Sequence, residues 1–459
     1  MTLYSLIHNV RNSVRNNLKR LATSVDFNIC INSVKVHEHK QGILHSIINA
    51  CDYIPKACNY IPERMMITAG LALACCSSPI ISYSKRDQTQ LTDLLQQIDA
   101  NLPIITQDAN LATGLSNYQR LQNYELSEYK PIQFTLPNGT LEDGIYKQGE
   151  STAPLIIGSF GFFSDVHANA VYNFTHIVRE EVLQDYNVLI LNHPSSAPFY
   201  CANGEASWGG IEEGYIIIEI AKQMKEQFGI SHVHAIGVSM GGNGVMHAAY
   251  RGKRVLDSAI AFSSVTDFLD VPGNTLRSLR NDSEFGPTFW SITGWLNSIG
   301  MKMLYDGFEE ERKKNPACKG KPFTLEEIET IYLTTPHYAN AERMKEYLAP
   351  YIADKILPEK MPSSLEEYLS MSDTTHIASS IQIPLLVVHA HDDAVVSEHH
   401  YYRFMLAGRE NPFINGIMTT DGGHWGFSAA YGTKFVACLI RTYTEYWSMP
   451  KLKPESKCF

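Results

Sequence analysis

The chain has 459 residues, of which 44% are hydrophobic, and its formal net charge is −10. This length and apolar content are enough for one large hydrophobic core with additional elements around it. A general nucleic-acid-binding protein carries a basic surface, so the acidic balance argues against nucleic acid as a partner. The nine cysteines match no spacing typical of zinc sites, and this pattern favours unpaired cysteines in a reducing compartment.

The first 127 residues are expected to form a separate, largely helical region. Apolar residues recur at helical spacing from Leu3 to Leu21, with basic residues between them. Such a basic amphipathic helix favours association with an anionic membrane surface and packing on the rest of the protein about equally. Because charges interrupt it from Arg11 onward, it does not resemble a secretory signal, and we expect a cytoplasmic protein.

Residues 65–84 form a second notable stretch within this region, because none of them is charged. Twenty residues are long enough to cross a bilayer. The stretch is only mildly apolar, however, since it includes Thr68, Gly70 and Pro79. Burial in the protein or shallow contact with a membrane is therefore favoured over a true span.

Strand and helix patterns alternate in 128–266 and return in 379–459, as a mostly parallel sheet with helices on both faces requires. The intervening residues 267–378 are mostly helical in pattern. We expect them to form a helical cap inserted over the active site. Apolar residues of this insertion, including Phe289 and Trp290, would line an acyl pocket or fill the core of the cap itself.

The pentapeptide Gly237-Val238-Ser239-Met240-Gly241 is the most informative segment of the chain. It follows the apolar run Val233–Ile236 and precedes a stretch compatible with a helix. A G-x-S-x-G motif in this context is a nucleophile elbow, a tight turn that exposes a serine hydroxyl. Each glycine is needed because a Cβ there would collide with the neighbouring strand or helix. Ser239 is the candidate nucleophile, and the alternative is a glycine-rich turn with a surface serine.

An acid and then a histidine should follow such a nucleophile in the chain. Asp393 lies three residues after Ala390, at the end of a predicted buried strand, and His424 lies in a glycine-flanked loop after the last predicted strand. A neutral imidazole can take the proton of Ser239, and a carboxylate can fix the tautomer of that imidazole. Asp393 is preferred as the acid because of its position after the strand. The alternatives considered are Asp392, Asp421 and Asp267.

Two backbone amides are expected to form the oxyanion hole. One is the amide of Met240, directly after the nucleophile, and the other is that of Ser159, after the predicted strand 153–157. This chemistry needs no metal and no organic cofactor. The histidines around the acid could suggest a metal site, but they bracket one strand and one helix start without a second ligand cluster; they are His389, His391, His399 and His400.

Three motifs together resemble one subfamily of the α/β-hydrolases: Gly237–Asn243, Ala390–Asp393 and Gly422–Phe427. This G-x-S-[ML]-G-G-N subfamily includes bacterial predicted hydrolases, animal monoacylglycerol and phospholipid lipases, and yeast medium-chain ethyl ester synthase/esterases. The resemblance covers roughly residues 128–448 and implies the α/β-hydrolase fold and small-molecule acyl ester or lipid substrates. The segment His193-Pro194-Ser195-Ser196 departs from the Arg-Gly pair usual at that place, and Ala394 stands where proline is common. Both departures border the substrate region.

The sequence therefore predicts a serine carboxylesterase or lipase that works through an acyl-enzyme. An acyltransferase with the same triad, in which an alcohol replaces water, remains an alternative. A non-catalytic binding protein on a hydrolase fold is a second alternative, although an intact triad argues against it. A third is an enzyme recruited to a membrane by its N-terminal region.

Overall fold

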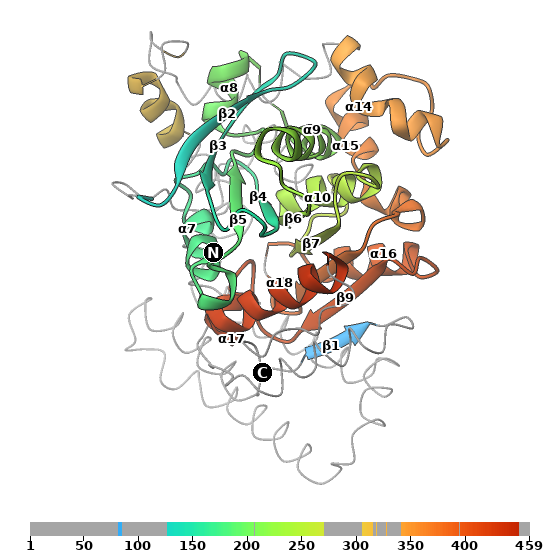
Figure 1. Cartoon of the computed structure of the whole chain (residues 1–459). Coiled ribbons are helices and arrows are strands. Elements are labelled where there is room, and N and C mark those ends of the chain that lie inside the picture. Colours follow the sequence, from blue (N-terminus) through green and yellow to red (C-terminus); the bar gives the residue numbers. More distant parts are fainter. Residues whose placement is uncertain are drawn as a thin grey trace, which may run out of the picture. The chain divides into compact units, whose positions relative to one another are not determined.

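The computed structural model describes residues 81–84, 126–205, 207–269, 305–314, 318, 327, 341–393 and 395–448 (Figure 1). The chain divides into two compact units, 1–76 and 77–459, and all described residues belong to the second. The expectations for the amphipathic pattern of Leu3 to Leu21, for residues 65–80, and for Phe289 and Trp290 lie outside the described residues.

Nine strands in the described residues form one sheet, in the order β1-β9-β8-β7-β6-β4-β5-β3-β2. The six central strands, from β5 to β9 in this order, pair in parallel, whereas β1, β2 and β3 pair antiparallel with their neighbours. The strands are β1 (Ile81–Ser84), β2 (Lys130–Thr135), β3 (Leu141–Lys147), β4 (Leu155–Ser159), β5 (Asn187–Leu191), β6 (Val233–Val238), β7 (Ser258–Phe262), β8 (Leu385–Ala390) and β9 (Ile414–Thr419).

Every residue of the six parallel strands is buried. Parallel strands are covered on both faces, which is why they read in the sequence as near-continuous apolar runs. The strand β2, at the end of the sheet, instead alternates between exposed and less exposed residues. The sequence pattern therefore distinguishes the centre of the sheet from its edge.

Helices cover the sheet in two groups (Figure 1). Helices α9 and α10 pack on one another, and α10 packs on β6 and β7; helices α7 and α18 form the other group, in which α18 contacts β7. The main helices are α7 (Asn169–Val178), α8 (Ala197–Asn203), α9 (Ile211–Phe228), α10 (Met240–Arg251), α14 (Ala341–Ala353), α15 (Leu365–Met371), α16 (His399–Ala407), α17 (Phe427–Tyr431) and α18 (Thr433–Ser448). A mostly parallel sheet with these connections is the α/β-hydrolase fold, as the resemblance implied.

The described part of the insertion 267–378 is largely helical and includes 305–314, α14 and α15. Helix α14 packs against α9 and α10 through two buried tyrosines. The Tyr347 hydroxyl donates to Oε1 of Glu212 on α9, and the Tyr351 hydroxyl lies 2.8 Å from Nδ1 of His247 on α10. This part of the insertion therefore supports the helix that follows the elbow.

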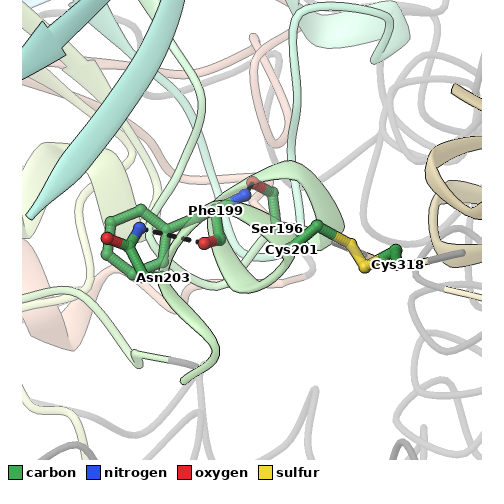
Figure 2. The surroundings of a disulfide bond; sticks show 5 residues. All are labelled: Ser196, Phe199, Cys201, Asn203 and Cys318. Carbon is green, nitrogen blue, oxygen red and sulfur yellow. Dashed lines mark hydrogen bonds between the residues drawn. A yellow bond between two sulfur atoms is a disulfide. The ribbon is translucent and has the colours of Figure 1, made fainter. Parts of the chain in front are cut away.

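A disulfide bond joins Cys201 of α8 to Cys318, 117 positions further along the chain (Figure 2). Helix α8 is itself fixed at its start, where the Ser196 hydroxyl accepts the N–H of Phe199. The expectation that the cysteines are unpaired is wrong for this pair, because the fold brings together two residues that sequence spacing does not relate. Disulfides persist in oxidising environments, so the pair removes the cysteine argument for a reducing compartment.

The strand β1 is the other departure from the sequence expectations. Its four residues belong to the uncharged stretch 65–84, and they pair antiparallel with β9 from Ile81 opposite Thr419 to Ser84 opposite Gly416. The sheet thus takes one strand from outside the ranges 128–266 and 379–459. Across the part of the chain that the structure describes, no helix is both long and apolar enough to cross a membrane.

Candidate active site

The strand order places a reversal next to the elbow. From β4 the chain forms β5 on one side of that strand and then crosses to form β6 on its other side. In open α/β sheets, ligands bind beyond the carboxyl ends of the strands at such a reversal. The two connections that leave this point are the β4–α7 loop, residues 160–168, and the turn at Ser239 between β6 and α10.

Ser239 occupies a strained turn. Its backbone has φ 61° and ψ −121°, a combination that residues other than glycine seldom adopt. Its N–H donates to the Phe262 carbonyl at the end of β7, and its own carbonyl accepts from Asn243 and Val265. These three hydrogen bonds hold the strained backbone in place, and the residue is 6% exposed.

The two glycines of the motif are required by close packing, as the sequence suggested. A Cβ on Gly237 would lie 2.2 Å from the carbonyl oxygen of Gly241, and a Cβ on Gly241 would lie 2.5 Å from that of Ser159. Both contacts are with backbone atoms, which cannot move aside cheaply. The elbow therefore presses α10 against the ends of β4 and β6.

The structure brings Asp393 and His424 together. Nδ1 of His424 lies 3.0 Å from Oδ2 of Asp393, and Oδ1 of the same carboxylate accepts the N–H groups of Val395 and Val396, each at 2.9 Å. Burial alone would raise the pKa of Asp393, but the charge and hydrogen bond of His424, with the nearby His389, lower it below its ordinary value. A carboxylate held ionised in this way keeps a proton on Nδ1 of His424 and leaves Nε2 as the basic nitrogen.

The three alternative acids have other partners. Asp392 accepts the N–H of Gly423 at 2.7 Å, so it braces the loop that carries the histidine. Asp421 accepts the hydroxyl of the adjacent Thr420, as expected of a turn residue. Asp267 pairs with Arg403 at 2.6 Å.

The loop of His424 is packed against the strand ends beside Ser239. The Ser263 hydroxyl, directly after β7, donates to the Gly423 carbonyl at 3.5 Å. The ring of Trp425 lies 5.2 Å from that of Phe262, whose carbonyl binds the N–H of Ser239, and 6.1 Å from that of Phe160 in the β4–α7 loop. The end of β7 thus links the turn at Ser239 to the loop of His424.

Met240 is the first residue of α10, so its N–H is one of the helix-start amides without an intrahelical acceptor. Ser159 is the last residue of β4, in register with Gly237, and its hydroxyl donates to Glu213. The residue of this segment that the structure brings close to Ser239 is Gly161, where a Cβ would lie 3.0 Å from Cβ and 3.3 Å from Oγ of Ser239. The backbone N–H groups of Gly161 and Phe162 donate to no residue in the described part of the chain.

Two of the histidines near the acid, His389 and His400, are buried in the fold. His389 is buried and its Nε2 lies 3.0 Å from the Val396 carbonyl, while Nδ1 of buried His400 accepts the N–H of Thr266. His391 is exposed and pairs with Glu398. Among the described residues, no group of three histidine, cysteine or acidic side chains is arranged to hold a metal ion.

Comparison with protein-family models and with curated proteins gave no match. Among solved structures, the chain is similar to an esterase from Pyrococcus furiosus, with a TM-score of 0.45 and 15% identity over 72% of this chain and 98% of that one. It is also similar to a putative aryl esterase from Burkholderia cenocepacia, with a TM-score of 0.39 and 14% identity over 68% and 99%. For an acylaminoacyl peptidase from Pyrococcus horikoshii the values are 0.40 and 13%, over 74% and 46%. The strand order and connections define the fold independently of these similarities.

Sequence reasoning missed Gly161 and the buried side chains behind it. The signal for Gly161 was its position two residues after Ser159, whose amide was expected in the oxyanion hole. The signal for the buried side chains was the departure at His193 and Ser195, which the resemblance marked as unusual. Nothing local in the sequence connects these residues with Glu213 on α9.

Proposed function

We propose that this protein is a serine hydrolase that cleaves acyl esters through Ser239, His424 and Asp393. The observation that carries the proposal is the Asp393–His424 hydrogen bond, formed at the same edge of the sheet as a serine in a strained elbow. An oriented imidazole and a serine hydroxyl on a tight turn are the two parts that acyl transfer to serine requires.

In the proposed reaction, Nε2 of His424 takes the proton of Ser239 while Oγ attacks the ester carbonyl. The amides of Met240 and of the β4–α7 loop hold the negative oxygen of the tetrahedral intermediate. The carbon–oxygen bond to the leaving alcohol then breaks, and that alcohol receives the proton from His424. Water, deprotonated by His424, attacks the acyl-enzyme, which releases the acid and restores Ser239.

The acyl ester or lipid as substrate class is supported by the resemblance of the Gly237–Asn243, Ala390–Asp393 and Gly422–Phe427 motifs to esterases and lipases. We also propose that this protein belongs to the α/β-hydrolase subfamily that shares these motifs. The basic amphipathic pattern of Leu3 to Leu21 supports recruitment to a membrane surface, where a lipid substrate would lie. Flotation of the full-length protein with vesicles containing anionic lipid tests this recruitment, and no flotation would count against it.

A fluorophosphonate probe and a p-nitrophenyl ester series from acetate to palmitate test the function. We expect the probe to label the native protein and Ser263→Ala, but not Ser239→Ala. Ser263 is the matched control because it follows the neighbouring strand and also has a positive φ, 44°. Labelling with turnover that peaks at one acyl length supports the proposal, whereas a folded protein that is neither labelled nor active contradicts it. Turnover that rises on addition of an alcohol acceptor, with the transfer ester as product, would indicate the acyltransferase alternative.

A further inference from the structure

A second group of serine, histidine and carboxylate lies behind the β4–α7 loop. Ser195 and His193 follow β5, and Glu213 lies in the first turn of α9. The exposed fractions of these residues are 0%, 0% and 1%. None of the three belongs to the proposed triad, and together they touch both ends of the segment that contains Gly161.

One end of the segment is held through Ser195. Its hydroxyl oxygen accepts the N–H of Phe163 at 2.8 Å and lies 2.6 Å from Nδ1 of His193. The backbone N–H of Ser195 also donates to this Nδ1, at 3.1 Å. Because Nδ1 accepts there, the Ser195 hydroxyl donates its proton to the ring and keeps its lone pair for Phe163. The N–H of His193 adds a bond to the Ser164 carbonyl at 2.9 Å.

The other end is held through Glu213. The Ser159 hydroxyl donates to Oε1 of Glu213. Oε2 of the same carboxylate lies 3.3 Å from Nε2 of His193, at ion-pair distance but without the alignment of a hydrogen bond. The three side chains and their backbone thus hold the residues on both sides of Phe160, Gly161 and Phe162.

Glu213 also contacts the helix of the nucleophile. A Cβ on Gly244 of α10 would lie 2.4 Å from the carboxyl carbon of Glu213, and a Cβ on Gly209 would lie 3.0 Å from its Oε2. The glycine in α10 therefore leaves the space that the carboxyl group fills. One buried side chain thus contacts both α10, the helix after Ser239, and Ser159 at the end of β4.

This group is unsuited to be a second catalytic triad. The ring is turned the opposite way, since Nδ1 faces the serine and Nε2 faces the carboxylate, whereas in the proposed triad Nδ1 of His424 faces the acid. In addition, all three side chains are out of reach of a substrate because they are fully buried. Their contacts are with the backbone and side chains of the segment that faces Ser239.

We propose that Ser195, His193 and Glu213 form a positioning clamp that fixes the segment Ser159–Ser164 at the distance from Ser239 that oxyanion binding requires. Oxyanion donors act only when they are held rigidly at the position of the developing charge, and small displacements are expensive. The clamp does not touch the reacting atoms. Its role in catalysis rests on the proposed function, whereas its effect on the order of the segment does not.

The test compares Ser195→Ala with Ser258→Ala. Ser258 is the matched control because its hydroxyl lies 2.8 Å from Nδ1 of the buried His234. It is the first residue of β7, whereas Ser239 follows the carboxyl end of β6, so the two lie at opposite ends of the parallel strands. Glu213→Gln, which keeps the side-chain shape, serves as a second variant if Ser195→Ala does not fold. We expect kcat to fall about 10- to 100-fold in the clamp variants, with KM within about twofold, and Ser258→Ala to keep the native kcat. The inhibition constant of an alkyl trifluoromethyl ketone, which forms an oxyanion on Ser239, should rise in parallel with the fall in kcat/KM.

Hydrogen–deuterium exchange of peptides that cover 159–164 gives a readout that needs no activity. We expect faster exchange of this segment in both clamp variants and native exchange in Ser258→Ala. Native exchange together with native kcat in folded clamp variants would overturn the inference. If the native protein proved inactive on every ester, faster exchange in the clamp variants alone would still establish the clamp, and only the proposed function would fail.

Discussion

Nδ1 of His424 and Oδ2 of Asp393 lie 3.0 Å apart, although 31 positions separate these residues in the chain. The neighbouring Asp392 turns the other way and binds the backbone of Gly423. Two adjacent carboxylates thus divide the work, since one orients the imidazole and the other fixes the loop that carries it. This division makes the pair a direct test of the site.

Replacement of Asp393 with Asn should lower kcat about 10³- to 10⁴-fold, because an amide that donates to Nδ1 favours the wrong tautomer of His424. Asp392→Asn, which keeps an oxygen for the Gly423 N–H, should cost less than about tenfold. Steady-state hydrolysis of the preferred p-nitrophenyl ester measures both effects. Equal losses in the two variants would count against Asp393 as the acid.

Gly161→Ala should lower kcat/KM about 100-fold or more, because the new methyl group would lie 3.0 Å from Cβ and 3.3 Å from Oγ of Ser239. The thermal midpoint should change little, since the crowding falls on the nucleophile. Gly158→Ala, in the preceding strand, is the control, as its Cβ would first meet the rings of Phe160 and Phe174, at 3.3 and 3.4 Å. Similar kinetics for the two variants would show that Gly161 does not border the reacting hydroxyl.

Asp392→Asn should also change how stability depends on pH. Burial raises the pKa of Asp392 to about 6, against the hydrogen bond from Gly423. The pKa of Asp392 is higher in the folded protein than in the unfolded chain. Its carboxyl group therefore stabilises the folded protein most at low pH, and this stabilisation is lost as the pH rises towards 6. Relative to the native protein, the free energy of unfolding of the variant should therefore rise between about pH 4 and pH 6. Above that range the difference should stay constant, on the order of 1 kcal/mol after solvent screening. Thermal midpoints at pH 4, 5, 6 and 8 measure it, and an advantage that shrinks with rising pH would contradict the assigned pKa.

Loss of the disulfide bond should destabilise the protein by about 2–5 kcal/mol, because the bond closes a long loop in the unfolded chain. Cys201→Ser and Cys318→Ser should lower the thermal midpoint by similar amounts, and the double variant should lose no more than either single one. Additive losses would mean that the two cysteines act independently. Mass spectrometry of the unreduced native protein should find the peptide pair joined.

The residues of the proposed triad could be selected from sequence because each has a local signature at a strand end. The elbow needs its glycines for steric reasons, and the acid and histidine follow buried apolar runs. Position after the strand favours Asp393 over Asp392 as the acid, and in the structure Asp393 contacts His424 whereas Asp392 binds the Gly423 N–H. The direction in which a loop side chain points depends on the loop that packs against it. The sequence does not show which loops pack together.

The parts that escaped prediction all depend on segments that meet only after folding. Cys201 and Cys318 have no shared pattern, and the clamp joins three short segments around Ser159, His193 and Glu213. A buried polar residue reads in sequence as an ordinary one until its partner is known. The sequence signal for the clamp was the segment His193-Pro194-Ser195, which stands where the resemblance leads one to expect an Arg-Gly pair.

The pairing of β1 with β9 determines where the hydrolase part of this protein can be cut. A shortened protein that starts at residue 128 would retain every residue of the proposed triad but would leave the backbone donors and acceptors of β9 unpaired along one border. An uncovered border of this kind is a template for pairing between molecules. We expect such a truncation to self-associate through β9, whereas a start upstream of Ile81 would keep β9 paired with β1.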